Sequence, residues 1–190
     1  MEENLTGFGN YISEIKKSIK RRQLLGIKYH YADVPLFYYP LGVSKDFFLG
    51  AEEYMFDIDG YQIRRHEDIV GVEEVNDFTA KINIEEGLVD KLIDYKINLT
   101  SFETIFTDLY NMDEYISVER EYEDEDEFFL VGRIVKVTEF SIWFENFTNE
   151  GIWNSEINII PYDIITTIRF NNKYINTWKK YIKKDNKNED

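Results

Sequence analysis

The residues best suited to chemistry in this chain are one acidic run and two histidines. The run, residues 121–127, places six carboxylates around one tyrosine: Glu121, Glu123, Asp124, Glu125, Asp126 and Glu127. It lacks the alternating ligands and central glycine of an EF-hand loop, so calcium binding is not indicated. Charges packed this densely repel one another and favour a solvated hairpin loop, or they form an acidic docking surface for a basic protein partner. Both interpretations stay open, and the six acids are the predicted partner-binding residues.

The two histidines, His30 and His66, do not form a catalytic or metal-binding pattern. His30 lies in an extended segment between two tyrosines, and His66 lies beside Arg65 and Glu67 at a turn. A helical zinc site needs ligands one turn apart, and a nucleophilic triad needs partners that converge on one histidine. The chain has no cysteine, which excludes disulfides and thiol catalysis. We therefore predict a non-enzymatic protein with no catalytic residue, no metal ligand and no cofactor.

The elements that position these residues are read from the hydrophobic pattern. A helix is expected over residues 9–22, because apolar residues recur there at spacings of three and four. Asp59-Gly60 is a strong hairpin signal, and a one-turn helix is expected near residues 66–69. Segments rich in aromatic and branched residues predict five strands, over residues 24–31, 36–44, 47–57, 60–66 and 71–75.

The same order of elements recurs in the second half of the chain. A helix capped by Thr100 or Ser101 comes first, and a terminal helix over residues 173–182 comes last. Residues 76–98 connect the halves and contain a short helix that starts near Glu85. Five further strands are predicted over residues 115–122, 127–138, 140–147, 152–160 and 165–170.

The chain also matches itself at an offset of 90 residues. Residues 25–42 align with residues 115–132 without a gap, so that Gly42 falls on Gly132. One inserted residue later, Gly60 falls on Gly151. A fixed period indicates an architecture built from related units. Each unit is near the size at which a lone core is marginal, so we expect the two to pack against each other.

A helix followed by five short antiparallel strands, with a one-turn helix before the fifth, resembles an SH3-like barrel of the Sm-like kind. The sequence at residues 160–165 also resembles a group of uncharacterised bacterial proteins with tandem barrels. The predicted fold is mainly β with accessory helices (α+β): tandem five-stranded SH3/Sm-like barrels, each preceded by a helix, plus a C-terminal helix. The expected domains are residues 1–82 with the first barrel, residues 83–100 as a helical connection, and residues 101–190 with the second barrel.

The charge of the chain argues against nucleic-acid binding. The net charge is −15, and residues 103–127 hold eleven acids and one base. Such a field repels phosphate groups. The resemblance to Sm-like proteins would imply an Arg-Gly turn for RNA, but Val70-Gly71 and Thr166-Thr167 stand at that position. We therefore expect no nucleic-acid partner.

The expected function follows from these exclusions. No apolar stretch is long enough to span a bilayer, and the first residues lack a signal-peptide pattern, so we expect a soluble cytoplasmic protein without a membrane partner. The predicted function is that of a protein-binding interaction module. The alternative is an acidic immunity protein that neutralises a basic, nuclease-type bacterial toxin. The sequence indicates neither the oligomeric state nor which unit carries the binding surface.

Overall fold

The first half of the protein contains one long helix, five strands and a helical connection. The computed structural model describes residues 9–122 and 127–182. The elements of the first half are α1 (Gly9–Arg21), β1 (Leu25–Tyr29), β2 (Leu36–Val43), β3 (Phe47–Tyr54), β4 (Asp57–Arg65), the 3₁₀ turn η1 (His66–Asp68) and β5 (Ile69–Glu74). The connection that follows holds α2 (Phe78–Glu85) and the 3₁₀ turn η2 (Leu88–Lys91).

The second half repeats this series of elements. They are α3 (Phe102–Asn111), β6 (Tyr115–Arg120), β7 (Phe128–Val137), β8 (Ser141–Asn146), β9 (Asn158–Pro161), the 3₁₀ turn η3 (Tyr162–Ile164), β10 (Thr167–Phe170) and α4 (Lys173–Tyr181). A 3₁₀ turn precedes the last strand of each half, as the sequence predicted.

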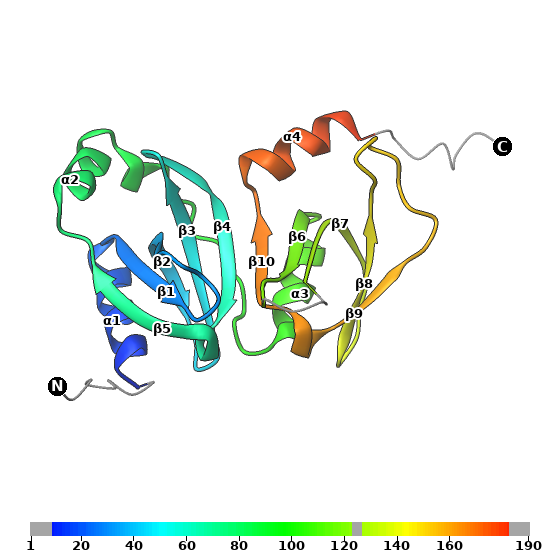
Figure 1. Cartoon of the computed structure of the whole chain (residues 1–190), viewed down its shortest axis with the longest axis horizontal. Coiled ribbons are helices and arrows are strands. Elements are labelled where there is room, and N and C mark those ends of the chain that lie inside the picture. The colour runs from blue at the N-terminus through cyan, green and yellow to red at the C-terminus, as the bar shows by residue number, and fades with distance from the viewer. Residues whose placement is uncertain (1–8, 123–126, 183–190) are drawn as a thin grey trace.

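All these strands form one open antiparallel sheet in the order β5-β1-β2-β3-β4-β10-β6-β7-β8-β9. The two halves therefore follow the same strand order, and Figure 1 shows them side by side with β4 against β10. The predicted class, mainly β with accessory helices, is confirmed. The expected tandem five-stranded barrels are not confirmed, because the strands of both halves join into one open sheet in which β4 pairs with β10 from Tyr61↔Phe170 to Arg64↔Thr167. Each half thus covers the other's strand edge instead of closing on itself.

The ungapped alignment of the halves is wrong over their second strand. A bulge interrupts β2 between Pro40 and Gly42, and the matching bulge interrupts β7 between Ile134 and Lys136. Gly42 therefore corresponds to Lys136 and not to Gly132. The reason is that the β6–β7 hairpin pairs over six residues, whereas the β1–β2 hairpin pairs over three.

The predicted hairpin turn at Asp59-Gly60 is also wrong. The chain reverses at Met55 and Phe56, which both have positive φ, and Gly60 lies within β4. Gly60 is needed there for another reason. Its φ is +81°, and a Cβ at this position would lie 2.5 Å from the Cβ of Asn172. The glycine therefore marks the close approach of the second half to the first.

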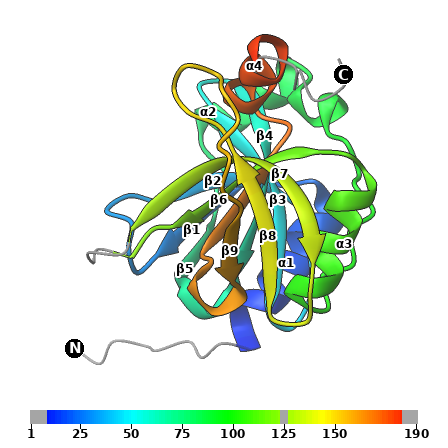
Figure 2. The ribbon, with the colours of Figure 1, turned by 90° about the vertical axis from the view of Figure 1, so that its right-hand side faces the viewer.

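The connecting helix lies earlier than expected. It ends at Glu85, where the sequence predicted it to begin. Asp77 caps its first turn by accepting a hydrogen bond from the backbone N–H of Ala80, and Gly87 follows it with a φ of +69°. In both views of the molecule, α2 and α4 lie at the same end of the sheet (Figures 1 and 2).

The hydrophobic core has two parts. The larger part includes residues of both halves and packs beneath α3, which supplies Ile105, Phe106 and Leu109. The smaller part belongs to the first half and packs beneath α1 through Ile15. Within the described ranges, no helix is long and apolar enough to cross a membrane.

The two outer strands of the sheet, β5 and β9, differ from ordinary open edges. The hydroxyl of Tyr11 on α1 donates a hydrogen bond of 2.9 Å to the carbonyl of Val70 on β5. At the other margin, β9 ends in Pro161, which has no N–H to offer a further strand.

Candidate functional site at the junction of the two halves

The three strands at the junction present different side chains to their two faces, because successive residues of a strand alternate. Tyr61 and Ile63 of β4 enter the larger core, while Gln62 and Arg64 lie on the opposite face and are also buried. The neighbouring strands alternate in the same way. On β10, Ile168 and Phe170 enter the core and Arg169 lies on the polar face. On β6, Ile116 and Val118 enter the core and Ser117 and Glu119 lie on the polar face.

Arg64 lies at the centre of the polar face and is fully buried. Its two terminal nitrogens donate to both carboxylate oxygens of Glu121, at 2.8 and 3.1 Å. Its Nε donates to Gln62 at 2.7 Å, and Nη1 also donates to the hydroxyl of Tyr31 at 3.0 Å. The guanidinium carbon lies 4.6 Å from the centre of the Tyr29 ring. This planar cation therefore joins the first half to β6 of the second through a bidentate ion pair.

Arg169 of β10 forms the second centre of the network. It donates from Nη1 to Glu52 at 2.9 Å, and its Nε lies 2.9 Å from Glu119. The hydroxyl of Ser117 donates to Glu119 at 2.7 Å. Two guanidinium groups thus face three carboxylates, so the network carries a surplus of negative charge when all of its acids are ionised.

The pKa values of the three acids are shifted in different directions. Burial raises the pKa of Glu119 and that of Glu52, although Arg169 opposes the change in both. Burial also acts to raise the pKa of Glu121, but the attraction of Arg64 and Arg169 together with hydrogen bonds from Arg64 and Thr167 outweighs it, so this pKa is lowered. The network therefore stabilises the carboxylate form of Glu121 more than that of Glu119 or Glu52.

The structure separates the predicted acidic run into different environments. Glu121 belongs to the buried network, because it continues the alternation of Ser117 and Glu119 on the polar face. Glu127 is exposed at the start of the next strand. Glu123, Asp124, Glu125 and Asp126 lie outside the described residues.

A recess beside this network is lined by side chains from both halves. It has a volume of 390 Å³, and its lining residues are His30, Tyr31, Ala32, Asp33 and Tyr122. The His30 ring stacks on Tyr122 at 5.3 Å and meets Tyr31 edge-on at 4.9 Å. Asp33 is exposed at the rim. The loop after β1 and the segment after β6 therefore build one aromatic site across the junction.

A buried carboxylate, that of Asp68, holds this aromatic group in place. Its Oδ1 accepts a hydrogen bond from the hydroxyl of Tyr122 at 2.9 Å and lies 3.1 Å from Nε2 of His30. Arg65 donates to the same tyrosine hydroxyl at 3.1 Å. Among the described residues, Oδ2 of Asp68 has no hydrogen-bond partner, and the Nε of Arg65 is 3.6 Å away. One carboxylate oxygen is therefore left with acceptor capacity.

The two histidines lie in different surroundings. His30 contributes a half-exposed ring to the recess, whereas His66 is buried in η1 and burial lowers its pKa. Within residues 9–122 and 127–182, no three acidic or histidine side chains gather in a way that would hold a metal ion. The sequence analysis missed Arg64 and Asp68. The only signal for Arg64 was a charged residue at an alternating position of an apolar strand, and the only signal for Asp68 was an acid in a tight turn.

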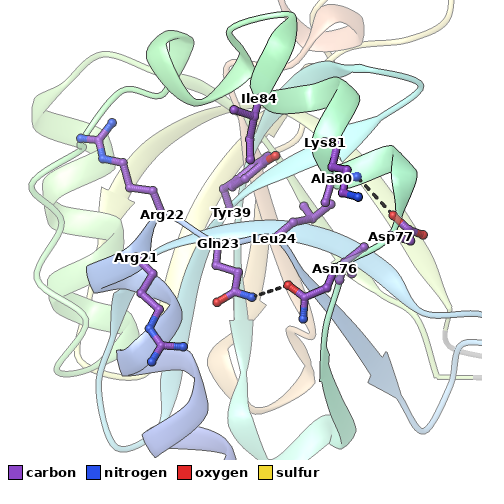
Figure 3. Close-up of a pocket in the computed structure, with 11 residues that line it drawn as sticks. Arg21, Arg22, Gln23, Leu24, Tyr39, Asn76, Asp77, Ala80, Lys81 and Ile84 are labelled. Atoms are coloured by element: carbon purple, nitrogen blue, oxygen red, sulfur yellow. Dashed lines mark hydrogen bonds between the residues drawn. The ribbon is translucent and has the colours of Figure 1, made fainter.

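A second cavity lies in the first half, away from the junction (Figure 3). Its volume is 290 Å³. It lies between the end of α1, the end of β5 and the helix α2, with Leu24 and Tyr39 at its centre and Ile84 above them. Gln23 and Asn76 close one side through a hydrogen bond of 2.9 Å.

Comparisons with protein-family models, with curated proteins and with solved structures found no match. The function is therefore inferred from the chemistry of the junction site and of this cavity.

Proposed function

We propose that this protein is a non-enzymatic, cytoplasmic protein-binding module whose partner is basic. A cationic side chain of the partner inserts into the recess formed by His30, Tyr31 and Tyr122. The observation that supports this proposal is the meeting of aromatic rings and carboxylates from both halves at one 390 Å³ recess.

The chemistry of the recess favours a cation. The face of an aromatic ring attracts a guanidinium or ammonium group within about 6 Å. The protein already uses this contact internally, since Arg64 lies 4.6 Å from the Tyr29 ring and Arg133 lies 4.3 Å from the Trp153 ring. Asp33, which lines the recess and is exposed, adds negative charge. The acids at residues 123–127 follow Tyr122 directly and would attract a basic partner toward it.

The fold is part of the same proposal. Each half has a helix, five strands in the same order and a 3₁₀ turn before the fifth strand, which supports descent from one small SH3-like or Sm-like unit. Neither half carries the RNA-binding turn of that resemblance, and the net charge of −15 opposes phosphate, so nucleic acid is not the proposed ligand.

The proposal is tested by fluorescence anisotropy with a labelled arginine-rich peptide as the probe. Tyr122→Ala and Asp33→Lys should each weaken binding about tenfold or more, because they remove a ring and reverse a rim charge. Asp90→Lys, which makes the same charge change at an exposed site away from the recess, is the matched control. Equal affinity of all four proteins would overturn the proposal.

A second set of variants separates the recess from the acidic run. Reversing Asp124, Glu125 and Asp126 to Lys should slow association and decrease its salt dependence, because it removes charges that attract a basic probe, while the ring contacts of the bound state remain. If this triple variant loses all binding while Tyr122→Ala loses none, the run and not the recess is the docking surface.

The alternative function, an immunity protein against a basic nuclease-type toxin, requires the same kind of partner. The acidity of the chain supports it. A gene for a large secreted toxin directly beside the gene of this protein, and inhibition of that toxin by the purified protein, would establish it. Housekeeping genes on both sides would argue for the general binding module.

A further inference from the structure

The cavity in the first half has an apolar centre. Leu24 and Tyr39 form its base, and Ala80 and Ile84 of α2 cover it (Figure 3). Its 290 Å³ lies near the lower end of the range of about 300–1,000 Å³ that ligand pockets span. The volume therefore fits a small ligand with a compact apolar body.

The helix that follows the fifth strand packs differently in the two halves. In each half a helix follows the fifth strand, α2 after β5 and α4 after β10. Helix α4 packs through aromatic rings, because Trp178 lies 5.2 Å from Phe147 and Tyr174 lies 6.0 Å from Phe129. Helix α2 packs through no aromatic side chain, since its one ring, Phe78, is 74% exposed, and Ile84 is 66% exposed. The apolar surface of α2 is thus left incompletely buried at the mouth of the cavity.

Much of the positive charge around this cavity is already paired, since Arg21 lies 3.8 Å from Glu74 and Arg22 lies 3.3 Å from Asp94. Its lining includes three cationic side chains, Arg21, Arg22 and Lys81, and one acid, Asp77. The carboxylate of Asp77 is engaged as the cap of α2, where it accepts the N–H of Ala80. In Figure 3, Arg21 and Arg22 lie on one side of the apolar centre and Lys81 on the other. Among the described residues, Lys81 is therefore the lining cation without an ion pair, and it is the group at the rim that an anionic head would contact.

We infer that this cavity binds a small amphipathic anion, with an apolar body of roughly eight carbons and a carboxylate-like head. The body packs against Leu24, Tyr39 and Ile84. The head lies at the rim beside Lys81. This site shares no residue with the recess at the junction, so it is independent of the proposed protein-binding function.

The test uses the full-length protein and sodium octanoate as the probe, with binding measured by calorimetry. Ala80→Trp, which fills the cavity, should abolish binding, and Lys81→Glu should weaken it at least about fivefold because it reverses a rim charge. Lys180→Glu makes the same charge change on α4 and should leave the affinity unchanged. Octylamine, which has the same chain and the opposite charge, should bind at least about tenfold more weakly than octanoate.

Amide chemical-shift mapping of the unsubstituted protein supplies a second measurement that does not depend on how the variants fold. Octanoate should shift the amides of residues 21–24 and 75–84. Shifts elsewhere, or no binding of octanoate, would overturn the inference. Octylamine binding as tightly as octanoate would do so too, as would unchanged binding by a folded Ala80→Trp protein.

Discussion

The two faces of the junction strands β4, β10 and β6 are both buried, yet they use opposite chemistry. On one face, Ile63, Ile168 and Val118 lie in the core shared by the two halves. On the other, Arg64 and Arg169 bind three glutamates in a network of direct ion pairs. The same three strands thus bury a hydrocarbon layer and an ionic layer.

The two faces contribute differently to the alignment of β4 with β10. Hydrophobic contact has no direction, and related side chains in the core can be exchanged at modest cost. A bidentate pair such as Arg64–Glu121 requires one alignment, because a shift of one residue would move every side chain to the other face. A buried ion pair is weak evidence for stability. We therefore expect the apolar face to supply stability and the ionic face to select the pairing of β4 with β10.

The largest effect is expected from Arg64→Ala. It leaves Glu121 buried without its cation and should lower the free energy of unfolding by about 3–5 kcal/mol, measured by urea denaturation. Arg22→Ala is the control. It removes an exposed pair with Asp94 at 3.3 Å and should cost less than about 1 kcal/mol. Equal losses in the two variants would show that the ionic face carries no special energy.

Ile168→Ala tests the apolar face of the same strands. Ile168 is fully buried on β10, and the cavity left by the substitution should cost about 2–4 kcal/mol. Ile168→Val, which removes one methylene, should cost about 0.5–1.5 kcal/mol in the same urea titration. A loss from Ile168→Ala no larger than that from Ile168→Val would contradict the assignment of stability to this face.

Glu121→Gln and Glu119→Gln should act in opposite directions. The lowered pKa of Glu121 gives stability that is present above its usual pKa of 4.5 and is lost as the pH falls through the lowered value. The raised pKa of Glu119 has the reverse sign, so stability falls as the pH rises from 4.5 through the raised value. At pH 7, Glu121→Gln should destabilise the protein, while Glu119→Gln should leave it equal or more stable.

The pH profile of thermal unfolding checks this pair of predictions. The Glu121→Gln protein should lose part of the acid-side decline that the parent shows below pH 4.5. The Glu119→Gln protein should lose part of the decline above it. Two parallel profiles would mean that Glu121 and Glu119 are equivalent, against the difference inferred from their surroundings.

A smaller change than that of Arg64→Ala is expected when both members of the central pair are replaced. Arg64→Met combined with Glu121→Leu removes both charges and keeps the site filled, so stability should stay within about 2 kcal/mol of the parent. Register then depends on the apolar face and on the remaining pairs of Arg169. Hydrogen exchange should show weaker protection of the β4 and β10 amides in this variant than in Ile168→Val. Equal protection would remove the register-selecting role from the ionic face.

Much of the fold could be predicted because local patterns agree with it. The strands, the 3₁₀ turns and the capped helix α3 follow from alternation, turn residues and Ser101 at the cap. Whether each half closes into its own barrel could not be predicted, since five strands in this order are compatible with a barrel and with an open sheet. The deciding interaction is the pairing of Arg64 with Thr167, between residues distant in sequence. No local pattern encodes a contact of that range.

The site was less predictable than the fold. The sequence singled out Glu121 for its negative charge, but its neighbours in space come from β4 and β10 and change its role from surface acid to buried partner. The sequence places Tyr31 beside His30 and Tyr122 inside the acidic run, but nothing in it predicts that the two rings meet. Their convergence on Asp68 depends on the join between the halves, which the repeat alone does not specify. The turn at Met55 and Phe56 was missed because residues of this size rarely adopt positive φ.

The two outer strands of the sheet, β5 and β9, affect whether a further strand can be added. A module that joins its copy edge to edge within one chain offers the same mode of addition to every neighbouring molecule, and unlimited addition would yield fibres. Here Pro161 at the end of β9 offers no N–H, and the hydroxyl of Tyr11 on α1 occupies the carbonyl of Val70 on β5. Both features reduce the number of backbone groups that a further strand could pair with, so they disfavour edge-to-edge growth beyond the two units.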